Sequence, residues 1–353
     1  MSRLTRQLTT LVLATTALSA FAIALSSCSE SGDDYQAKQS VDVYSGRHYN
    51  TDRKFYDRFS EETGIRVNLL ESSGDALLAR VKGEADASPA DLLIAADAGR
   101  LTNAVQLFDP PLLQPYNSAL IDREVPPYLR HPERLWTSFS RRIRAIIVNP
   151  EKLNPATVGT YQDLANPAFK GLLCLRNRKS VYNQSLVAWQ LERLGSESTA
   201  AWVAGMVGNL AQPVFANDVQ TVRATANGSC GVAVVNHYYL ARMLAGEMGS
   251  RDQELAEQVV LVWPDPAQEN VTGGGITRAA DNPEGATRLL EFLVSTDYLG
   301  GFHAGTHEYP LKGRGDDPIL QAWGPFRGAG VAMSALGERN KEATQLMKRE
   351  GWK

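Results

Sequence analysis

The stretch that decides the fold is VDVYSGRHYNTDRKFYDRFSEETGIRVNLL, residues 41–70. It opens with an alternating run typical of a strand, residues 41–45, and closes with another, residues 65–70. Between the two runs, Asn50 or Thr51 can cap an amphipathic helix. A strand, a helix and a strand within about thirty residues predict two parallel strands joined by a crossover helix.

The same alternation continues along the chain. Further helices are expected at 73–85, 97–108, 180–194, 197–207, 219–227, 237–244, 283–295 and 338–350, and further strands at 91–95, 136–149, 172–175, 231–235 and 259–263. This order predicts helices on both faces of a mostly parallel sheet. We expect the extended stretch 136–149 to connect two lobes, and the strand 259–263 to cross back to the first.

The elements predict two α/β lobes joined by extended hinge strands. The expected N-terminal lobe is 41–140 plus about 264–310, and the C-terminal lobe is 141–263 plus about 311–353. A cleft between two lobes is the usual place for a small ligand, and hinge closure is the usual motion.

Composition narrows the classes of partner. The chain has 353 residues, of which 43% are hydrophobic and 21% charged, as in ordinary globular proteins. The net charge is −3 and the pI is near 6.0, which does not favour a nucleic-acid partner. A monomer is expected.

The first 28 residues resemble an export signal. Arg3 and Arg6 precede an apolar run at 11–25, and the sequence LSSC ends at Cys28. Small residues before a cysteine resemble the lipobox of bacterial lipoproteins, in which that cysteine is lipidated. We therefore expect a periplasmic protein held to a membrane by a lipid on Cys28. The alternative is a plain signal peptide with an incidental cysteine. Residues 29–40 are polar and read as a flexible tether.

Removal of Cys28 leaves two cysteines, Cys174 and Cys230. Exported proteins fold in an oxidising compartment, so an even pair predicts a disulfide. The bridge would close a loop of about 57 residues and contribute about 4 kcal/mol. The alternative is two buried free thiols.

Four tyrosines lie at or near predicted helix starts: Tyr49, Tyr182, Tyr238 and Tyr239. Ligands of open α/β sheets bind outside the carboxyl ends of the strands, where such loops meet. A phenolate is a hard anionic donor, and a small trivalent cation can displace its proton. The absence of a cysteine or carboxylate set disfavours zinc and calcium. Each tyrosine taken alone is more often a packing residue.

A cluster of four phenolates needs counterions, because a buried net charge is costly. Arg242 shares a helix face with Tyr238 and Tyr239. Arg47 is a second candidate, and its neighbour His48 is open to a role as ligand, proton acceptor or hydrogen-bond donor. One further arginine is expected to face the cleft from the crossing strand, which carries Arg141, Arg142 and Arg144.

Six motifs along the chain carry a family resemblance. They are YSGRHY at 44–49, NPEKL at 149–153, SVYNQS at 180–185, NHYYLAR at 236–242, GGGI at 273–276 and HEYP at 307–310. In this order they resemble the ferric-iron-binding proteins of bacterial ABC importers, the bacterial transferrin group. The chain is most similar to the cyanobacterial Fut-type members, over nearly the whole mature sequence.

The resemblance implies a bilobal type II periplasmic-binding-protein fold. It implies an Fe³⁺ site built from Tyr49, Tyr182, Tyr238 and Tyr239, with Arg242 behind it and an iron ABC permease of the inner membrane as partner. His48 is a ligand in some relatives and a bystander in others. The use of Fe²⁺ as well, and a role for an exogenous anion or water, stay open.

Other functions compete with iron capture. The same fold could receive an organic anion or a polyamine, held by the cleft arginines. An enzyme is disfavoured, since the nucleophile elbow, the zinc-protease motif and the P-loop are missing. Residues 273–275, Gly-Gly-Gly, lack dinucleotide spacing and are expected to form a turn near the lobe crossing. A lipoprotein without a ligand is disfavoured by the clustered tyrosines.

Overall fold

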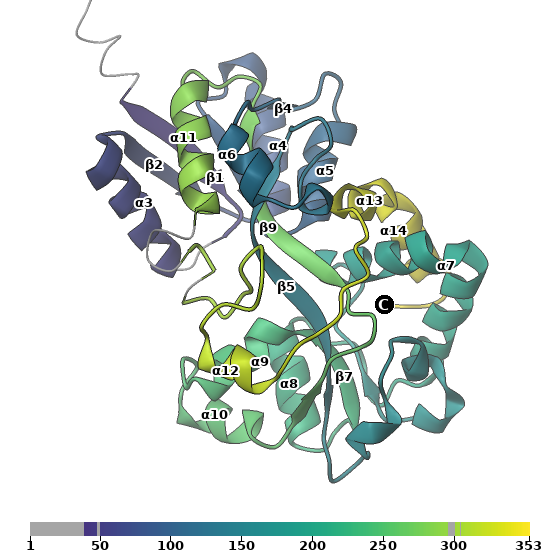
Figure 1. Cartoon of the computed structure of the whole chain (residues 1–353). Coiled ribbons are helices and arrows are strands. Elements are labelled where there is room, and N and C mark those ends of the chain that lie inside the picture. The colour runs from purple at the N-terminus through teal and green to yellow at the C-terminus, as the bar shows by residue number, and fades with distance from the viewer. Residues whose placement is uncertain (1–38, 48–49, 296–300, 304) are drawn as a thin grey trace, which may run out of the picture.

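The computed structural model describes residues 39–47, 50–295, 301–303 and 305–353 (Figure 1). The strands are β1 Ser40–Ser45, β2 Arg66–Glu71, β3 Leu92–Ala95, β4 Leu113–Gln114, β5 Thr137–Val148, β6 Leu173–Cys174, β7 Val232–Asn236, β8 Val260–Val262 and β9 Glu269–Thr277. The helices are α3 Asn50–Thr63, α4 Gly74–Glu84, α5 Ala98–Gln106, α6 Ala119–Glu124, α7 Val181–Gly208, α8 Asp218–Ala226, α9 His237–Leu244, α10 Ser250–Ala256, α11 Pro283–Val294, α12 Pro318–Ala322, α13 Met333–Glu338 and α14 Asn340–Arg349.

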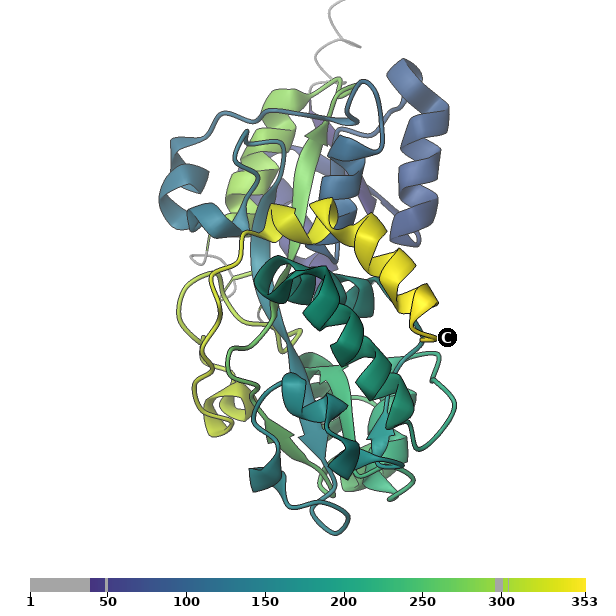
Figure 2. The same ribbon diagram turned by 90° about the vertical axis from the view of Figure 1, so that its right-hand side faces the viewer.

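Two α/β lobes are joined by the long strands β5 and β9, which run from one lobe toward the other (Figures 1 and 2). The strand order is β2-β1-β3-β9-β5-β7-β6. The first part of β5 pairs with β9, and its last five residues pair with β7. One continuous buried strand therefore links both halves of the sheet.

The predicted unit at 41–70 is confirmed, since β1 and β2 are parallel and α3 connects them. The prediction of a mostly parallel sheet is wrong in the centre. There β3, β9, β5 and β7 pair antiparallel. This arrangement follows from the two connecting strands, which run in opposite directions between the lobes.

Two predictions about the lobe crossing are also wrong. The strand predicted at 259–263 does not return to the first lobe, because β8 pairs with β5 in the second. The crossing is made by β9, which contains the Gly-Gly-Gly segment expected as a turn. A Cβ atom at Gly273 or Gly275 would collide with the carbonyl oxygen of Thr137 or Leu135. Glycine is therefore required here by close strand packing rather than by a turn.

The long helix α7 contains a kink. Gly195 has φ 76° and ψ 174°, so the helix is broken where the sequence predicts two helices. Helix α14 packs on α7, and α13 contacts both α5 and α7. The C-terminal helices thus lie beside the junction of the lobes (Figure 2).

A disulfide joins Cys174, at the end of β6, to Cys230, just before β7. These two strands are parallel neighbours, and the Cα atoms of the cysteines are 5.8 Å apart. The bridge therefore ties together two strands whose following segments carry the tyrosines of interest.

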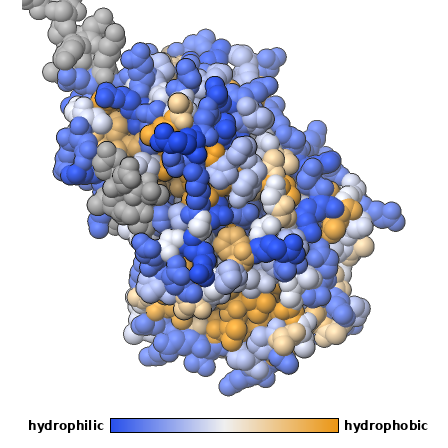
Figure 3. Space-filling view, in the orientation of Figure 1, coloured by the Kyte–Doolittle hydropathy of each residue, from blue (hydrophilic) through white to orange (hydrophobic). Residues whose placement is uncertain are grey.

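The surface differs between the lobes. On the face shown in Figure 3, hydrophilic residues dominate the lobe that carries α3 and α11, whereas hydrophobic residues gather over the lobe that carries α8, α9 and α12. In the part of the chain that the structure describes, no helix has the length and apolar character to cross a bilayer.

Candidate metal centre

The Tyr238-Tyr239 pair lies where β7 passes directly into α9. Asn236 ends the strand and precedes the helix, as predicted, but its side chain makes no capping hydrogen bond. Its amide nitrogen instead donates to the hydroxyl oxygen of Tyr238 at 3.3 Å. Its amide oxygen accepts from the Arg144 guanidinium at 3.2 Å. Because a guanidinium only donates, Arg144 fixes which end of the amide faces the phenol.

The two adjacent phenols lie close together at the helix start. Their ring centroids are 4.4 Å apart and their planes are inclined by 37°. Tyr238 is buried, at 3% exposure, whereas Tyr239 is half-buried. Adjacent residues can converge in this way only near a helix end, where the chain is still turning.

Tyr182 approaches the pair from the first turn of α7. The Tyr238 hydroxyl donates to the Tyr182 hydroxyl oxygen at 3.4 Å. Both helices present their N-terminal ends here, which favours negative charge on the phenol oxygens. Three of the four predicted ligands are therefore neighbours. Tyr49 and His48 lie outside the described residues.

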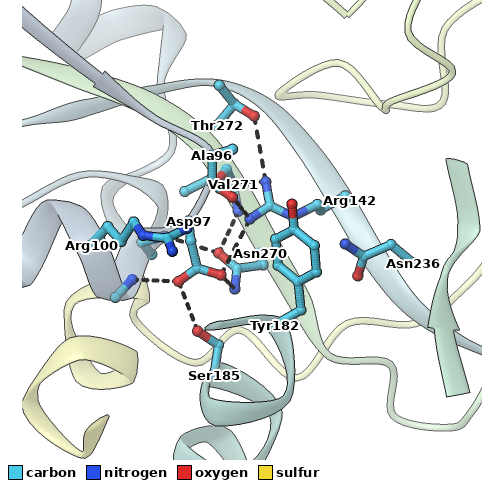
Figure 4. Close-up of polar contacts among 12 residues, drawn as sticks. Ala96, Asp97, Arg100, Arg142, Tyr182, Ser185, Asn236, Asn270, Val271 and Thr272 are labelled. Carbon is cyan, nitrogen blue, oxygen red and sulfur yellow. Dashed lines mark hydrogen bonds and ion pairs between the residues drawn. The ribbon is translucent and has the colours of Figure 1, made fainter. Parts of the chain in front are cut away.

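Arg142 is one cation that the structure places against these phenols. Its Cζ atom lies 5.2 Å from the centroid of the Tyr182 ring (Figure 4). The guanidinium donates to the Val271 carbonyl at 2.8 Å and to the Ala96 carbonyl, and it pairs with Asp97 at 3.3 Å. Burial opposes its charge, but Asp97 and the phenols raise the pKa of Arg142 above its ordinary value. Of the three arginines on β5, this one faces the tyrosines.

A buried carboxylate that the sequence analysis missed holds Arg142 in place. Asp97 is fully buried and caps α5 through the Gly99 amide at 2.8 Å. It also accepts from Ser185 at 2.8 Å and from Asn270 at 2.9 Å, so it links α5, α7 and β9 (Figure 4). Burial raises the pKa of Asp97, and Arg142 opposes that rise. Its position before a helix signals a cap, but nothing in the sequence signals this network.

Arg47 is buried just before the undescribed residues 48–49. It pairs with Asp52 at 2.8 Å and with Glu308 at 3.0 Å, and it donates to Thr272 at 2.8 Å. Burial opposes ionisation of Glu308, but Arg47 and Arg142 lower the pKa of Glu308 below its usual range. The guanidinium therefore ties the segment after β1 to α3, to β9 and to Glu308.

Arg242 lies in the last turn of α9. It pairs with Glu247 at 2.8 Å, and Glu247 also contacts the ring of His307 at 3.1 Å. The predicted arginine thus shares a helix with the tyrosine pair, and a carboxylate orients it. The sequence analysis did not anticipate Glu247 or His307.

His237, the first residue of α9, packs beside Tyr238 on one side and Tyr309 on the other. Its ring is fully buried, 5.0 Å from the centroid of Tyr309 and 6.0 Å from that of Tyr238. Its Nδ1 atom contacts the backbone of Ile143 on β5. Burial lowers the pKa of His237 to about 4, so the ring is neutral at physiological pH. A neutral, packed histidine positions the first turn of α9 against β5.

The donor set favours a hard, highly charged cation. Within residues 39–47, 50–295, 301–303 and 305–353, no group of three or more His, Cys, Asp or Glu side chains could hold a metal ion. Clustered phenol oxygens with cations and helix N-termini around them suit an ion that can remove phenol protons. Zinc and calcium prefer other donor sets.

Comparisons with known proteins identify relatives over the same chain length. Iron uptake protein A1 of Synechocystis sp. is 37% identical, with 93% of each chain covered. The structure of Trichodesmium FutA in complex with iron and citrate is 38% identical and superimposes with a TM-score of 0.84, covering 89% of this chain and 100% of that one. Apo FutA2 from Synechocystis is 36% identical with a TM-score of 0.83, covering 89% and 99%.

The fold of these neighbours is the bilobal type II periplasmic-binding-protein fold. Residues 45–299 match the family model described as bacterial extracellular solute-binding protein. The chain therefore belongs to the family of bacterial extracellular solute-binding proteins, on the branch of the iron-binding members.

Proposed function

We propose that this chain is the solute-binding component of an iron ABC importer, and that it carries Fe³⁺ between its lobes. The observation that carries the proposal is the convergence of phenols. The hydroxyl oxygens of Tyr182 and Tyr238 lie 3.4 Å apart, and the ring of Tyr239 lies against that of Tyr238. The relatives reported above are an iron uptake protein and two FutA proteins, one of them solved with iron and citrate.

The proposed ligands are Tyr49, Tyr182, Tyr238 and Tyr239, and His48 is a candidate for a further ligand beside Tyr49. Four phenolates around a trivalent ion leave one excess negative charge, which nearby cations offset. We assign that role to Arg47, Arg142 and Arg242. Ferrous ion is a second candidate cargo for the same oxygen donors.

Release of the ion follows from the donors. Phenolates bind iron in competition with protons, so acid or reduction of the ion weakens the complex. Closure of the lobes would bury the ion and protect it from hydrolysis, and opening would present it to a permease of the inner membrane. The lobes proposed for this motion are 41–140 plus about 264–310, and 141–263 plus about 311–353.

The proposed location is the periplasm, with a lipid on Cys28 as the membrane anchor. The tether predicted at 29–40 would end where β1 begins, at Ser40. The family is extracellular, which supports export. The relatives are transport proteins, which favours binding without catalysis. A monomer is proposed, because all four candidate ligands belong to one chain.

Metal analysis of the purified protein tests the proposal. After incubation with ferric citrate and desalting, we expect one iron per chain by elemental analysis, and no comparable retention of zinc or calcium. A protein that retains no iron but binds a polyamine or an organic anion by calorimetry would establish the alternative receptor function.

A further inference from the structure

A second arginine lies against the ring of Tyr182, and the sequence analysis gave it no role. Arg176 lies just beyond β6, and its Cζ atom is 5.3 Å from the centroid of the Tyr182 ring. Arg142, from β5, lies at 5.2 Å from the same centroid. A guanidinium over an aromatic ring is stabilising, and more so where water is excluded. Two arginines from different segments therefore contact this phenol.

The Arg176 side chain is itself held in place. Its Nε atom donates to the Ala216 carbonyl at 3.1 Å, and its backbone forms a bridge with Phe215. Its side chain is 19% exposed. The backbone carbonyl of Arg176 accepts from Asn183, the residue after Tyr182, at 2.9 Å. Arg176 thus contacts both the ring of Tyr182 and the turn that carries it.

A buried carboxylate connects Arg176 with the other tyrosine. Asp218 is fully buried at the start of α8, and one of its oxygens lies 3.6 Å from the Arg176 guanidinium. Its other oxygen accepts from Arg144 at 2.6 Å and from the backbone N–H of Asn236 at 3.0 Å. Asn236 in turn donates to Tyr238. One carboxylate therefore sets the relative position of the residues that contact Tyr182 and Tyr238.

We infer that Arg176 and Asp218 are positioning residues for the iron site: Asp218 orients Arg176, and Arg176 holds the phenol of Tyr182 at bonding distance from the ion bound by Tyr238. This inference rests on the proposed function, since it assigns Tyr182 as a ligand. Neither residue contacts iron. They affect iron affinity only by setting the position of the Tyr182 hydroxyl oxygen.

A double-mutant cycle tests the inference, with ferric affinity measured by competition with citrate. Arg176→Gln is expected to lower the affinity about tenfold, the equivalent of about 1.4 kcal/mol, and to shift the phenolate-to-iron absorption band. Arg176→Lys, which keeps the charge but loses the planar contact, is expected to recover only part of the loss. In a Tyr182→Phe background, Arg176→Gln is expected to cause no further loss, because the oxygen that it positions is gone.

The matched control is Arg223→Gln. Arg223 is also in this lobe and also pairs with a carboxylate, that of Asp252, at 2.6 Å. Its substitution changes the charge equally and is expected to leave iron affinity and the band unchanged. Asp218→Asn is expected to lower the affinity as Arg176→Gln does, but it leaves buried arginines without their carboxylate and endangers folding. The main test therefore uses substitutions of the partly exposed Arg176. Thermal unfolding checks that each variant is folded.

The outcomes separate the two proposals. A wild-type protein that gains no iron overturns the proposed function and this inference together. A wild type that binds iron, with Arg176→Gln equal to it, overturns the inference alone. Additive losses in the Tyr182→Phe background also overturn it, because Arg176 would then act through general charge or stability.

Discussion

The hydroxyl oxygens of Tyr182 and Tyr238 lie 3.4 Å apart, although 56 residues separate them in the chain. Tyr182 lies in the first turn of α7 and Tyr238 in the first turn of α9. The strands before these helices are parallel neighbours, joined by the Cys174–Cys230 disulfide. A disulfide, the two arginines Arg142 and Arg176, and the buried carboxylate of Asp218 all lie in this small region. Such an arrangement is best explained by a need to fix oxygen positions.

The ion pair of Glu308 with Arg47 predicts a loss of stability in acid. The lowered pKa of Glu308 means that its contribution is present above the unfolded-state pKa of about 4.3 and is lost as the pH falls through the folded-state pKa. At pH 7, Glu308→Gln is expected to lower the free energy of unfolding by about 3 kcal/mol. Denaturant unfolding between pH 7 and pH 3 should show the difference from wild type shrinking, whereas the exposed Glu254→Gln should show little difference throughout. A Glu308→Gln effect independent of pH would contradict the assignment.

His307 predicts the opposite trend with pH. Burial opposes its charge, but the hydrogen bond to Asp317 at 2.5 Å and the nearby Glu247 raise the pKa of His307. Its contribution is therefore full below the unfolded-state pKa of about 6.5 and is lost as the pH rises through the folded-state pKa. His307→Gln is expected to cost about 1.5 kcal/mol at pH 6 and less at higher pH.

The control for that experiment is His131, whose pKa is lowered by burial. The difference in unfolding free energy between wild type and His131→Gln should shrink as the pH falls, whereas the difference for His307→Gln should grow. Equal slopes for the two variants would show that the pairing of His307 with Asp317 and Glu247 does not govern its titration.

The disulfide predicts a large change on reduction. Opening a loop of about 57 residues is expected to lower the free energy of unfolding by about 4 kcal/mol. Urea unfolding with and without dithiothreitol measures the change, and a Cys174→Ala, Cys230→Ala double variant, which cannot respond to the reductant, is the control. Coincident unfolding curves for wild type in the two conditions would show that the bridge contributes little.

The lipobox predicts acylation of Cys28. Expressed in a bacterial host, the wild-type chain is expected in the membrane fraction, with an N-terminal mass that includes a diacylglyceryl group on Cys28. Cys28→Ser should lose that mass and the lipid-dependent fractionation. Replacement of Ser29, the residue that follows Cys28, by Ala is a control that should leave the fractionation unchanged. An unmodified Cys28 in the mature chain would contradict the proposed lipid anchor.

The parts of the fold that follow from local pattern were predictable. The unit at 41–70 alternates clearly, and Pro283 marks the start of α11 as the structure shows. The β9 strand was not predictable, since Gly273–Gly275 has a low strand propensity and is chosen for close contact with strands from elsewhere in the chain. The local sequence does not show which distant strand will pack closely against these glycines.

The residues of the site also fall into those that were predictable from local sequence and those that were not. The strand-to-helix turn before Tyr238 and Tyr239 is local, so the pair could be found from the sequence. The carboxylates that support the site could not, because a buried acid is recognisable only by its distant partner. Arg47 and Glu308 are 261 residues apart, and Arg144 and Asp218 are 74 apart. Each of these acids reads as an ordinary surface residue until the fold brings the arginine to it.

The most direct test of the central claim is the visible absorption spectrum of the purified protein as ferric iron is added. Wild type is expected to develop a phenolate-to-iron band that saturates at one iron per chain, and Tyr238→Phe and Tyr239→Phe are expected to lose most of it. Tyr44→Phe, which alters only a phenol bonded to Glu84, should keep the band. A colourless iron-loaded wild type, or unchanged bands in Tyr238→Phe and Tyr239→Phe, would contradict a tyrosine-held ferric ion.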